Sequence, residues 1–282
     1  MLPARGRSSW LVAVVDNEPV ALGRDEPQIF GSRPGLRRLW VGVHPEHRRQ
    51  GIGAEVWRAI EAHAHQLGAR TLRSWSIDDD AGGKQFLMAR GFALRTKEVQ
   101  WWTDPTGIKP SEVEQATRKA HAEGFRVVSL RQVLGQMEPA LRRMYLEADS
   151  SVPGRTDAPV VAPRTFHRVI IDNPLLDLDC STVVLRDHEP VALCWLKGDR
   201  NVGRYGVEFT GTAAAWRGRG LASLAKLSAL RLAAQSGVRW VGTSNAYENA
   251  PMLAINRRLG HRALPDLLVF ERTSDRSRSM AG

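Results

Sequence analysis

Apolar and polar positions alternate along this chain in a way that predicts strands, glycine turns and helices in a fixed order. Residues 36–43 and 205–212 are rich in β-branched and aromatic side chains and each run leads into a glycine-rich turn, which predicts strands. After the first turn, Ile52, Val56 and Ile60 recur at helical spacing. We therefore expect a helix of about 16 residues with one buried face there.

An internal repeat underlies this order. The segment HRRQGIG (47–53) matches WRGRGLA (216–222). A separation of 169 residues recurs in three pairs: Arg48 with Arg217, Gly68 with Gly237, and Gly91 with Gly260. Three landmarks in constant register indicate a duplicated unit.

Each copy is expected to continue in the same way, with a glycine that ends the helix, a strand, a short helix and a final strand. The further strands are expected at 71–77, 93–102, 239–244 and 263–272, and hairpins at 10–23 and 181–198. Ser111 and Glu114 predict a capping box for a connecting helix. The predicted parts are a first domain (1–105), a linker with that helix (106–124), a complete second domain (125–273) and a disordered tail (274–282).

Composition narrows the class of protein. Apolar residues make up 43% and charged residues 25% of the 282 positions, as in globular proteins, and no long apolar run predicts a membrane span or a signal peptide. Two cysteines, Cys180 and Cys194, without metal-ligand spacing fit a reducing cytoplasm. The net charge of +10 raises the alternative of a nucleic-acid partner, but the basic residues are spread along the chain rather than clustered.

The order strand, Arg-x-x-Gly-x-Gly/Ala, helix, strand, helix, Leu-Gly-aromatic resembles that of the GNAT acetyltransferases. Both copies show it, and the second also carries NAPMLAINRRLGH (249–261). The resemblance covers nearly the whole chain. It implies an α/β (α+β) protein of two tandem GNAT-like domains, each a splayed mixed sheet flanked by helices, with the first copy truncated at its N-terminus. It also implies acetyl-CoA, or another acyl-CoA, as the acyl donor.

The glycine turns have the chemistry of a diphosphate site. Glycines let backbone amides approach a ligand, the dipole of the following helix favours an anion, and arginines add charge-assisted hydrogen bonds. In the second copy the expected cofactor-binding residues are Arg217, Gly218, Arg219, Gly220, Leu221 and Ala222. In the first copy they are Arg48, Arg49, Gln50, Gly51, Ile52 and Gly53. The alternative is a tight strand-to-helix turn with solvated arginines.

The resemblance also places the cofactor's pantetheine arm along the strand before each turn. The residues implied are Phe209, Thr210, Gly211 and Thr212 in the second copy, and Val41 and Val43 in the first. Asn245 and Asn249 match asparagines near the arm in that family. The first copy has Asp80 in place of Asn249, and a carboxylate there would repel a diphosphate.

Glu208 is the candidate catalytic base, because two-residue alternation puts it on the same face of its strand as Thr210. The alternative is a salt-bridged strand glutamate, and alignment gives Leu39 as its counterpart in the first copy. The family often has a tyrosine in its second helix as general acid, where this chain has Asn256 and Leu87. Tyr247 is a fallback for that role.

Two segments before the second hairpin, 136–153 and 163–174, are expected to be helices that shape an acceptor pocket. They and their connection carry four carboxylates that could attract a cationic amine or could be ordinary surface groups: Glu147, Asp149, Asp157 and Asp172. The sequence thus predicts a cytoplasmic N-acyltransferase acting on a small-molecule amine, with its activity in the second domain. A non-catalytic acyl-CoA-binding scaffold is the alternative, and a homodimer is left open.

Overall fold

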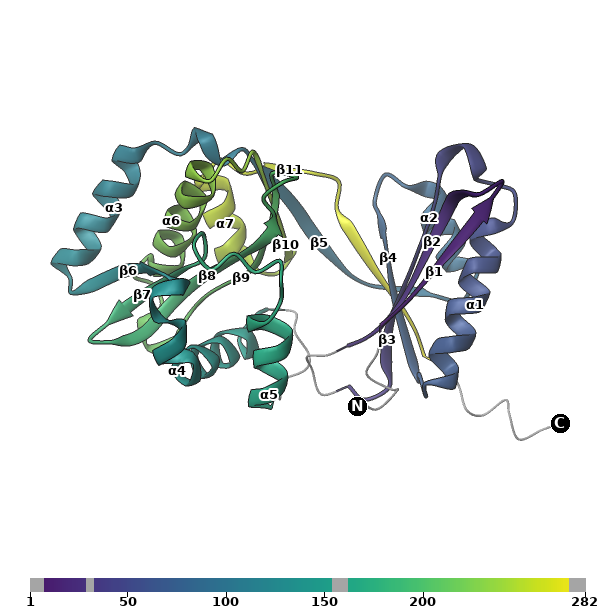
Figure 1. The fold of residues 1–282 in the computed structure, drawn as a ribbon, viewed down its shortest axis with the longest axis horizontal. Helices are drawn as coiled ribbons and strands as arrows, with labels where there is room; N and C mark the ends of the chain where they lie inside the picture. The colour runs from purple at the N-terminus through teal and green to yellow at the C-terminus, as the bar shows by residue number, and fades with distance from the viewer. Residues whose placement is uncertain (1–7, 29–32, 154–161, 274–282) are drawn as a thin grey trace. The chain divides into compact units, whose positions relative to one another are not determined.

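A computed structural model describes residues 8–28, 33–153 and 162–273. It divides into two compact units, which we call unit 1 (1–98 with 265–282) and unit 2 (99–264). The last strand of the second repeat copy therefore belongs with the first copy, as the yellow segment in Figure 1 shows. The tail at 274–282, expected to be disordered, lies outside the described residues.

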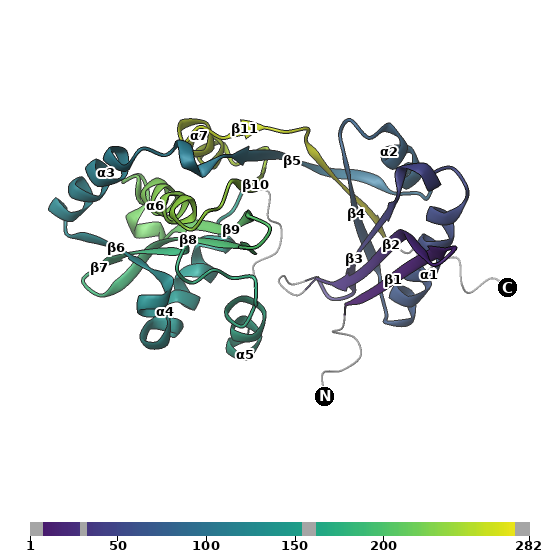
Figure 2. The ribbon, with the colours of Figure 1, turned by 45° about the horizontal axis from the view of Figure 1, so that its top comes forward.

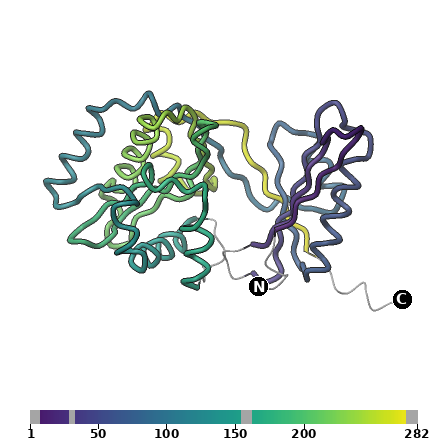
Figure 3. Tube along the Cα trace, in the orientation of Figure 1, coloured from purple at the N-terminus to yellow at the C-terminus, as the bar shows by residue number. Residues whose placement is uncertain are grey.

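Unit 1 is a mixed sheet in the order β1-β2-β3-β4-β12-β5. Its elements are β1 (Ser9–Val15), β2 (Glu18–Pro27), β3 (Leu36–Val43), η2 (Pro45–His47), α1 (Ile52–Gln66), β4 (Thr71–Ile77), α2 (Ala81–Met88), the first half of β5 (Ala93–Thr103), and β12 (Leu267–Thr273). The C-terminal strand β12 pairs antiparallel with both β4 and β5. Figure 3 shows the chain returning to unit 1 for this strand.

The core of unit 1 lies between its sheet and α1 and α2. Trp57 of α1 makes edge-to-face contacts with Phe86 and Phe92 at ring-centroid distances of 5.6 and 5.5 Å. Leu39 from β3 and Phe270 from β12 are buried in the same cluster. The returning C-terminal strand is therefore part of this core rather than an appendage.

Unit 2 has the order β6-β7-β8-β9-β10-β5, with β11 paired to β5. Its elements are η3 (Pro105–Gly107), α3 (Pro110–Ala122), β6 (Phe125–Ser129), α4 (Leu130–Ser150), α5 (Pro163–Phe166), the π-helical turn η4 (His167–Ile171), β7 (Thr182–Arg186), β8 (Glu189–Asp199), β9 (Arg204–Thr212), η5 (Ala214–Trp216), α6 (Leu221–Gln235), β10 (Trp240–Ala246), α7 (Ala250–Arg258) and β11 (Arg262–Ala263). The second half of β5 completes this sheet (Figure 2).

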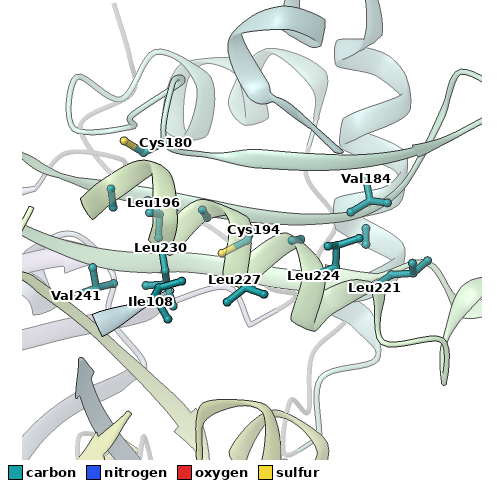
Figure 4. Close-up of a cluster of buried hydrophobic side chains, with 14 of the residues drawn as sticks. Ile108, Cys180, Val184, Cys194, Leu196, Leu221, Leu224, Leu227, Leu230 and Val241 are labelled. Atoms are coloured by element: carbon teal, nitrogen blue, oxygen red, sulfur yellow. The ribbon is translucent and has the colours of Figure 1, made fainter. Parts of the chain in front are cut away.

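Helices cover both faces of the unit 2 sheet. On one face α6 packs on Cys194 and Leu196 of β8 in an apolar cluster (Figure 4), and α3 covers the outer side of α6. Most side chains of α6 are consequently buried, rather than one stripe. On the other face Tyr145 of α4 stacks on Trp195 of β8 with ring centroids 5.3 Å apart.

The predicted turns are confirmed. Gly68 and Gly237 follow α1 and α6 with φ of 81° and 82°, the left-handed conformation that ends a helix. Both hairpins turn through two residues with positive φ, Asp16-Asn17 and Asp187-His188.

The predicted capping box at Ser111 is wrong. Helix α3 begins one residue earlier, at Pro110, whose fixed φ and missing N–H suit a first helical position, and its N-cap residue makes no side-chain cap. The capping box lies instead at Ser129 and Gln132, where it starts α4 six residues before the expected helix. The short strand β6 was not predicted.

Candidate active site

Two neighbouring parallel strands part in the middle of unit 2. Strands β9 and β10 pair over three residues and end their pairing at Gly206 and Gly242. The rest of β9 keeps only β8 as a neighbour, so in its regular stretch, 209–212, every second backbone amide points into the opening. The equivalent strands of unit 1, β3 and β4, also pair over three residues and then part.

The glycine turn of the second copy connects the end of β9 to the start of α6. Gly218 and Gly220 have φ of 78° and 75°, and no atom lies within 4 Å of where a Cβ would stand on either. In the described part of the chain, the amides of residues 218–223 donate to no backbone carbonyl. Free amides at the N-terminus of a 15-residue helix form the kind of site that binds phosphate, so the residues present fit the diphosphate of CoA.

An arginine braces each glycine turn. The Nε of Arg217 donates to the carbonyl of Thr212 at 3.2 Å, and the Nε of Arg48 donates to the carbonyl of Val43 at 3.1 Å. The guanidinium of Arg219 lies 5.3 Å from the ring centroid of Trp216. The second-copy turn therefore keeps two positive charges in defined positions beside its amides.

The turn of the first copy has the same backbone shape with a different residue. Arg49, with φ of 62°, stands where the second copy has Gly218, and Gly51 has φ of 86°. A non-glycine residue in this region costs about 1 kcal/mol or more. The shape is thus retained at some cost in the first copy.

Asp80 and Asn249 have the same structural role. Asp80 caps α2 by accepting from the amide of Gly83 at 2.9 Å, and Asn249 caps α7 by accepting from the amide of Met252 at 3.3 Å. Both residue types are good N-caps. The carboxylate that was expected to repel a diphosphate is therefore engaged at the start of a helix.

Glu208 is the extra residue of a β-bulge. Trp195 of β8 pairs with Phe209 and Leu196 pairs with Val207, so Glu208 has no partner in the ladder. The ladder between β2 and β3 is regular, and β3 is one residue shorter than β9. Leu39 is therefore not the counterpart of Glu208, because the first copy lacks the inserted position.

The bulge also breaks the alternation assumed from the sequence. The carboxylate of Glu208 forms an ion pair with Lys197 of β8. The hydroxyl of Thr210 contacts the sulfur of Cys194 at 3.4 Å, in the core that faces α6. Lys197 and Cys194 are three residues apart in a regular stretch of β8 and therefore lie on opposite faces of it. Glu208 thus shares a face with Lys197, and the prediction that it shares one with Thr210 is wrong.

The position expected for a general acid belongs to a buried polar chain. Asn256 of α7 is fully buried, accepts a hydrogen bond from Nζ of Lys226 at 2.5 Å and donates one to Oδ1 of Asn245 at 2.6 Å. Sequence reasoning missed Lys226, although a single lysine among the apolar residues of 221–233 was a visible signal. Tyr247, the fallback acid, is exposed.

Aromatic side chains line the sheet face under α4. Tyr145 contacts Phe166 and Phe209 as well as Trp195, with centroids 4.6 to 5.5 Å apart. This cluster lies on the same face as the pair Glu208–Lys197 and contributes an apolar wall beside it.

The four predicted acceptor carboxylates are used differently. Glu147 accepts from the amide of Ala214 at 2.7 Å, and Asp149 is buried in α4. Asp172 lies 3.1 Å from Nε2 of His167, whose pKa is raised chiefly by its hydrogen bond to Glu138. Asp157 lies outside the described residues.

Within residues 8–28, 33–153 and 162–273, no group of three or more His, Cys, Asp or Glu residues could hold a metal ion. No helix in those ranges is long and apolar enough to cross a lipid bilayer.

Known proteins resemble both this sequence and this fold. Residues 3–92 match the model of the acetyltransferase (GNAT) family. A mycothiol acetyltransferase of Amycolatopsis mediterranei (strain U-32) is 27% identical over 259 residues, which cover 89% of this chain and 79% of the relative.

Two solved structures have the same fold over most of the chain. A tandem GNAT protein from the clavulanic acid biosynthesis pathway matches with a TM-score of 0.68 and 20% identity, over 97% of this chain and 86% of its own. A GCN5-related N-acetyltransferase from Sphaerobacter thermophilus matches with a TM-score of 0.67 and 16% identity, over 92% and 78%. The chain therefore contains an acetyltransferase (GNAT) domain at residues 3–92, and over most of its length it shares the fold of a tandem GNAT protein.

Proposed function

We propose that this protein transfers an acetyl group from acetyl-CoA to a primary amine of a small molecule, and that unit 2 carries the reaction. The observation that carries the proposal is the opening between β9 and β10, which leads to a turn whose amides at 218–223 are unpaired within the described chain. A diphosphate at the turn and an extended arm in the opening would use these two features together.

Unit 2 supports catalysis better than unit 1. It has two glycines in the turn, whereas unit 1 has the strained Arg49. In unit 2, α4 and α5 lie on the sheet face beside Glu208. In unit 1, the helices α1 and α2 both pack into a single apolar cluster. The family model matches residues 3–92, which lie in the first copy. Which unit is active therefore has to be decided by experiment.

The residues of unit 2 have separable roles in this proposal. Bound acetyl-CoA supplies the thioester that the amine attacks. Amides of β9 that point into the opening hold the arm and stabilise negative charge on the acyl oxygen. Glu208, which forms an ion pair with Lys197, takes the proton that the acceptor ammonium must lose.

The acceptor and the compartment are also proposals. Because the curated relative is named for mycothiol, amines related to mycothiol are the first acceptors to assay. The two cysteines are free and buried, which supports the expected cytoplasmic location.

Calorimetric titration of the full chain with acetyl-CoA tests whether the cofactor binds. The matched variants R217E and R48E test which unit binds it. We expect R217E to abolish binding to unit 2 and R48E to leave it unchanged. Thiol release with a panel of amines then tests catalysis. Binding without thiol release would favour the acyl-CoA-binding scaffold, for which the asparagine at the general-acid position is the specific observation. No binding by the wild type would contradict both.

A further inference from the structure

Lys226 is a buried cation in the middle of α6. Its side chain is completely buried, and it is one of only six lysines among 40 basic residues. Its one hydrogen-bond partner in the described chain is Oδ1 of Asn256. Removing an ammonium from water costs several kcal/mol, which a single amide oxygen does not offset.

The fold itself does not require this lysine. The repeat places Trp57 at the position equivalent to Lys226, 169 residues earlier, and Leu87 at the position of Asn256. Both are buried in the apolar core of unit 1. The third member of the chain, Asn245, has Ser76 as its counterpart. The first copy thus builds the same helix pair around an apolar contact.

The ammonium determines which way two side-chain amides face. A lysine ammonium has three donors and no acceptor, so Asn256 must turn its oxygen toward it. The Nδ2 of Asn256 then faces Asn245 and must meet an oxygen there, which is the observed bond to Oδ1. Asn245 is left with its Nδ2, and therefore two N–H donors, directed away from Asn256.

Asn245 lies where these donors can be used. It stands on the part of β10 that has left β9, three residues beyond the last pair at Gly242, and is half-buried. No acceptor in the described part of the chain receives its Nδ2. Thr210 of the parted strand β9 contacts Cys194 in the core that also holds α6.

We propose that Lys226 is a positioning residue whose charge, relayed through Asn256, makes Asn245 a hydrogen-bond donor to an oxygen or sulfur acceptor of the acyl-CoA arm. The inference rests on the proposed function for its ligand. It gives this chain a donor near the thioester although no tyrosine stands at the general-acid position.

The charge that fixes this polarity is titratable. Burial lowers the pKa of Lys226 to about 8, against a smaller opposing effect of Cys194. The ionisable groups that face it are the thiol of Cys194 on β8, whose pKa burial raises, and the imidazole of His261 after α7, whose pKa burial lowers to about 3. From α3 and η3 the contacts on α6 are apolar, among them Ile108 and Val113. A neutral amine can accept a hydrogen bond, so the polarity is no longer imposed above pH 8.

Two measurements test the proposal, and the first needs no ligand. In the apo protein labelled with ¹⁵N, the side-chain amide signals of Asn245 and Asn256 should shift together with a midpoint near pH 8, and should not do so in K226M. Second, K226M and N245D should each weaken acetyl-CoA binding about tenfold or more at pH 7, the value of one charge-assisted hydrogen bond. Wild-type affinity should fall above pH 8, and that of K226M should not.

The controls separate the possible failures. K119M removes a charge from the exposed face of α3 and should leave binding unchanged. A wild type that does not bind acetyl-CoA refutes the proposed function, while the amide titration still decides the polarity. If the wild type binds acetyl-CoA and both K226M and N245D bind it with the same affinity, the role of Lys226 is refuted. If K226M does not fold, two results would still overturn the inference. One is that the side-chain amide signals of Asn245 and Asn256 in the wild type do not change with pH, and the other is that N245D binds acetyl-CoA with wild-type affinity.

Discussion

Lys226 and Trp57 occupy equivalent positions in the two repeat copies, and both are buried, one as a cation and the other as an aromatic wall. The same helix position therefore accepts either a charged or an aromatic side chain. The lysine makes stability depend on pH, because a buried amine with a lowered pKa releases its proton more easily in the folded state than in the unfolded one.

We expect the free energy of unfolding to rise with pH above about 8. The pKa of Lys226 is lowered from 10.5 to about 8, so between these values the unfolded chain binds more protons and stability increases with pH. The full difference, reached only above pH 10.5, corresponds to roughly 3 kcal/mol. Urea unfolding at pH 7 and 9 should show about 1.4 kcal/mol of it, the value of one pKa unit.

The matched variant is K226M/N256L, which gives unit 2 the apolar pair found in unit 1. It should be more stable than the wild type at pH 7, and the gap should narrow at pH 9. Buried Cys180, whose pKa is raised to about 11, opposes the trend above pH 9 in both proteins and cancels in the comparison. A gap that is constant with pH would show that Lys226 does not titrate in this range.

Glu208 should affect the rate of acetyl transfer rather than cofactor binding. E208Q keeps the shape of the side chain but removes its capacity to accept a proton, so we expect kcat to fall about 100-fold, within the usual contribution of a general base. The Kd for acetyl-CoA should stay the same. Steady-state kinetics with the best amine and calorimetry measure the two effects.

The ion-pair partner provides the control for this variant. K197M leaves the carboxylate in place but removes its neighbouring charge. We expect a smaller loss of rate in K197M than in E208Q, because the carboxylate that accepts the proton is still present. Equal losses in E208Q and K197M at every pH would indicate a structural salt bridge, the alternative reading of Glu208.

The local parts of this fold could be predicted from the sequence. Strands at 36–43 and 71–77 coincide with β3 and β4, and Gly51, Gly218 and Gly220 of the predicted turns have positive φ, whereas Gly53 lies within α1. These features depend on side-chain alternation and on the freedom of glycine, both of which are local. The roles assigned to the turn residues in cofactor binding stay predictions.

The features that sequence reasoning missed depend on partners far along the chain. A bulge at Glu208 exists only against β8, and a chain from Lys226 to Asn245 needs three separate elements. The assignment of 265–273 to unit 1 depends on pairing with β4 and β5. The repeat offset of 169 supplied the order of the elements but not which sheet each strand joins.

A buried carboxylate should control the stability of unit 1. Asp25 is completely buried, accepts from Nε of Arg37 at 2.6 Å and lies 2.7 Å from Nδ1 of His63. D25N would remove the buried negative charge that pairs with the guanidinium of Arg37, which costs about 3 kcal/mol or more. Urea unfolding should show this loss, whereas D187N, at the exposed pair with Arg186, should change stability by less than about 1 kcal/mol. Equal losses of unfolding free energy in D25N and D187N would show that the buried ion pair contributes no more to stability than the exposed one.

The last prediction separates backbone strain from ligand binding at the glycine turn. Gly220 and Gly237 have φ of 75° and 82°, and neither has an atom within 4 Å of a Cβ placed on it. Alanine at either position should therefore cost the same strain, about 1 kcal/mol, in thermal unfolding. Only Gly220 lies at the start of α6 among the unpaired amides, where a side chain would keep a diphosphate away from the backbone. G220A should weaken acetyl-CoA binding at least tenfold and G237A should not. Equal affinities in the two variants would place the diphosphate somewhere other than this turn.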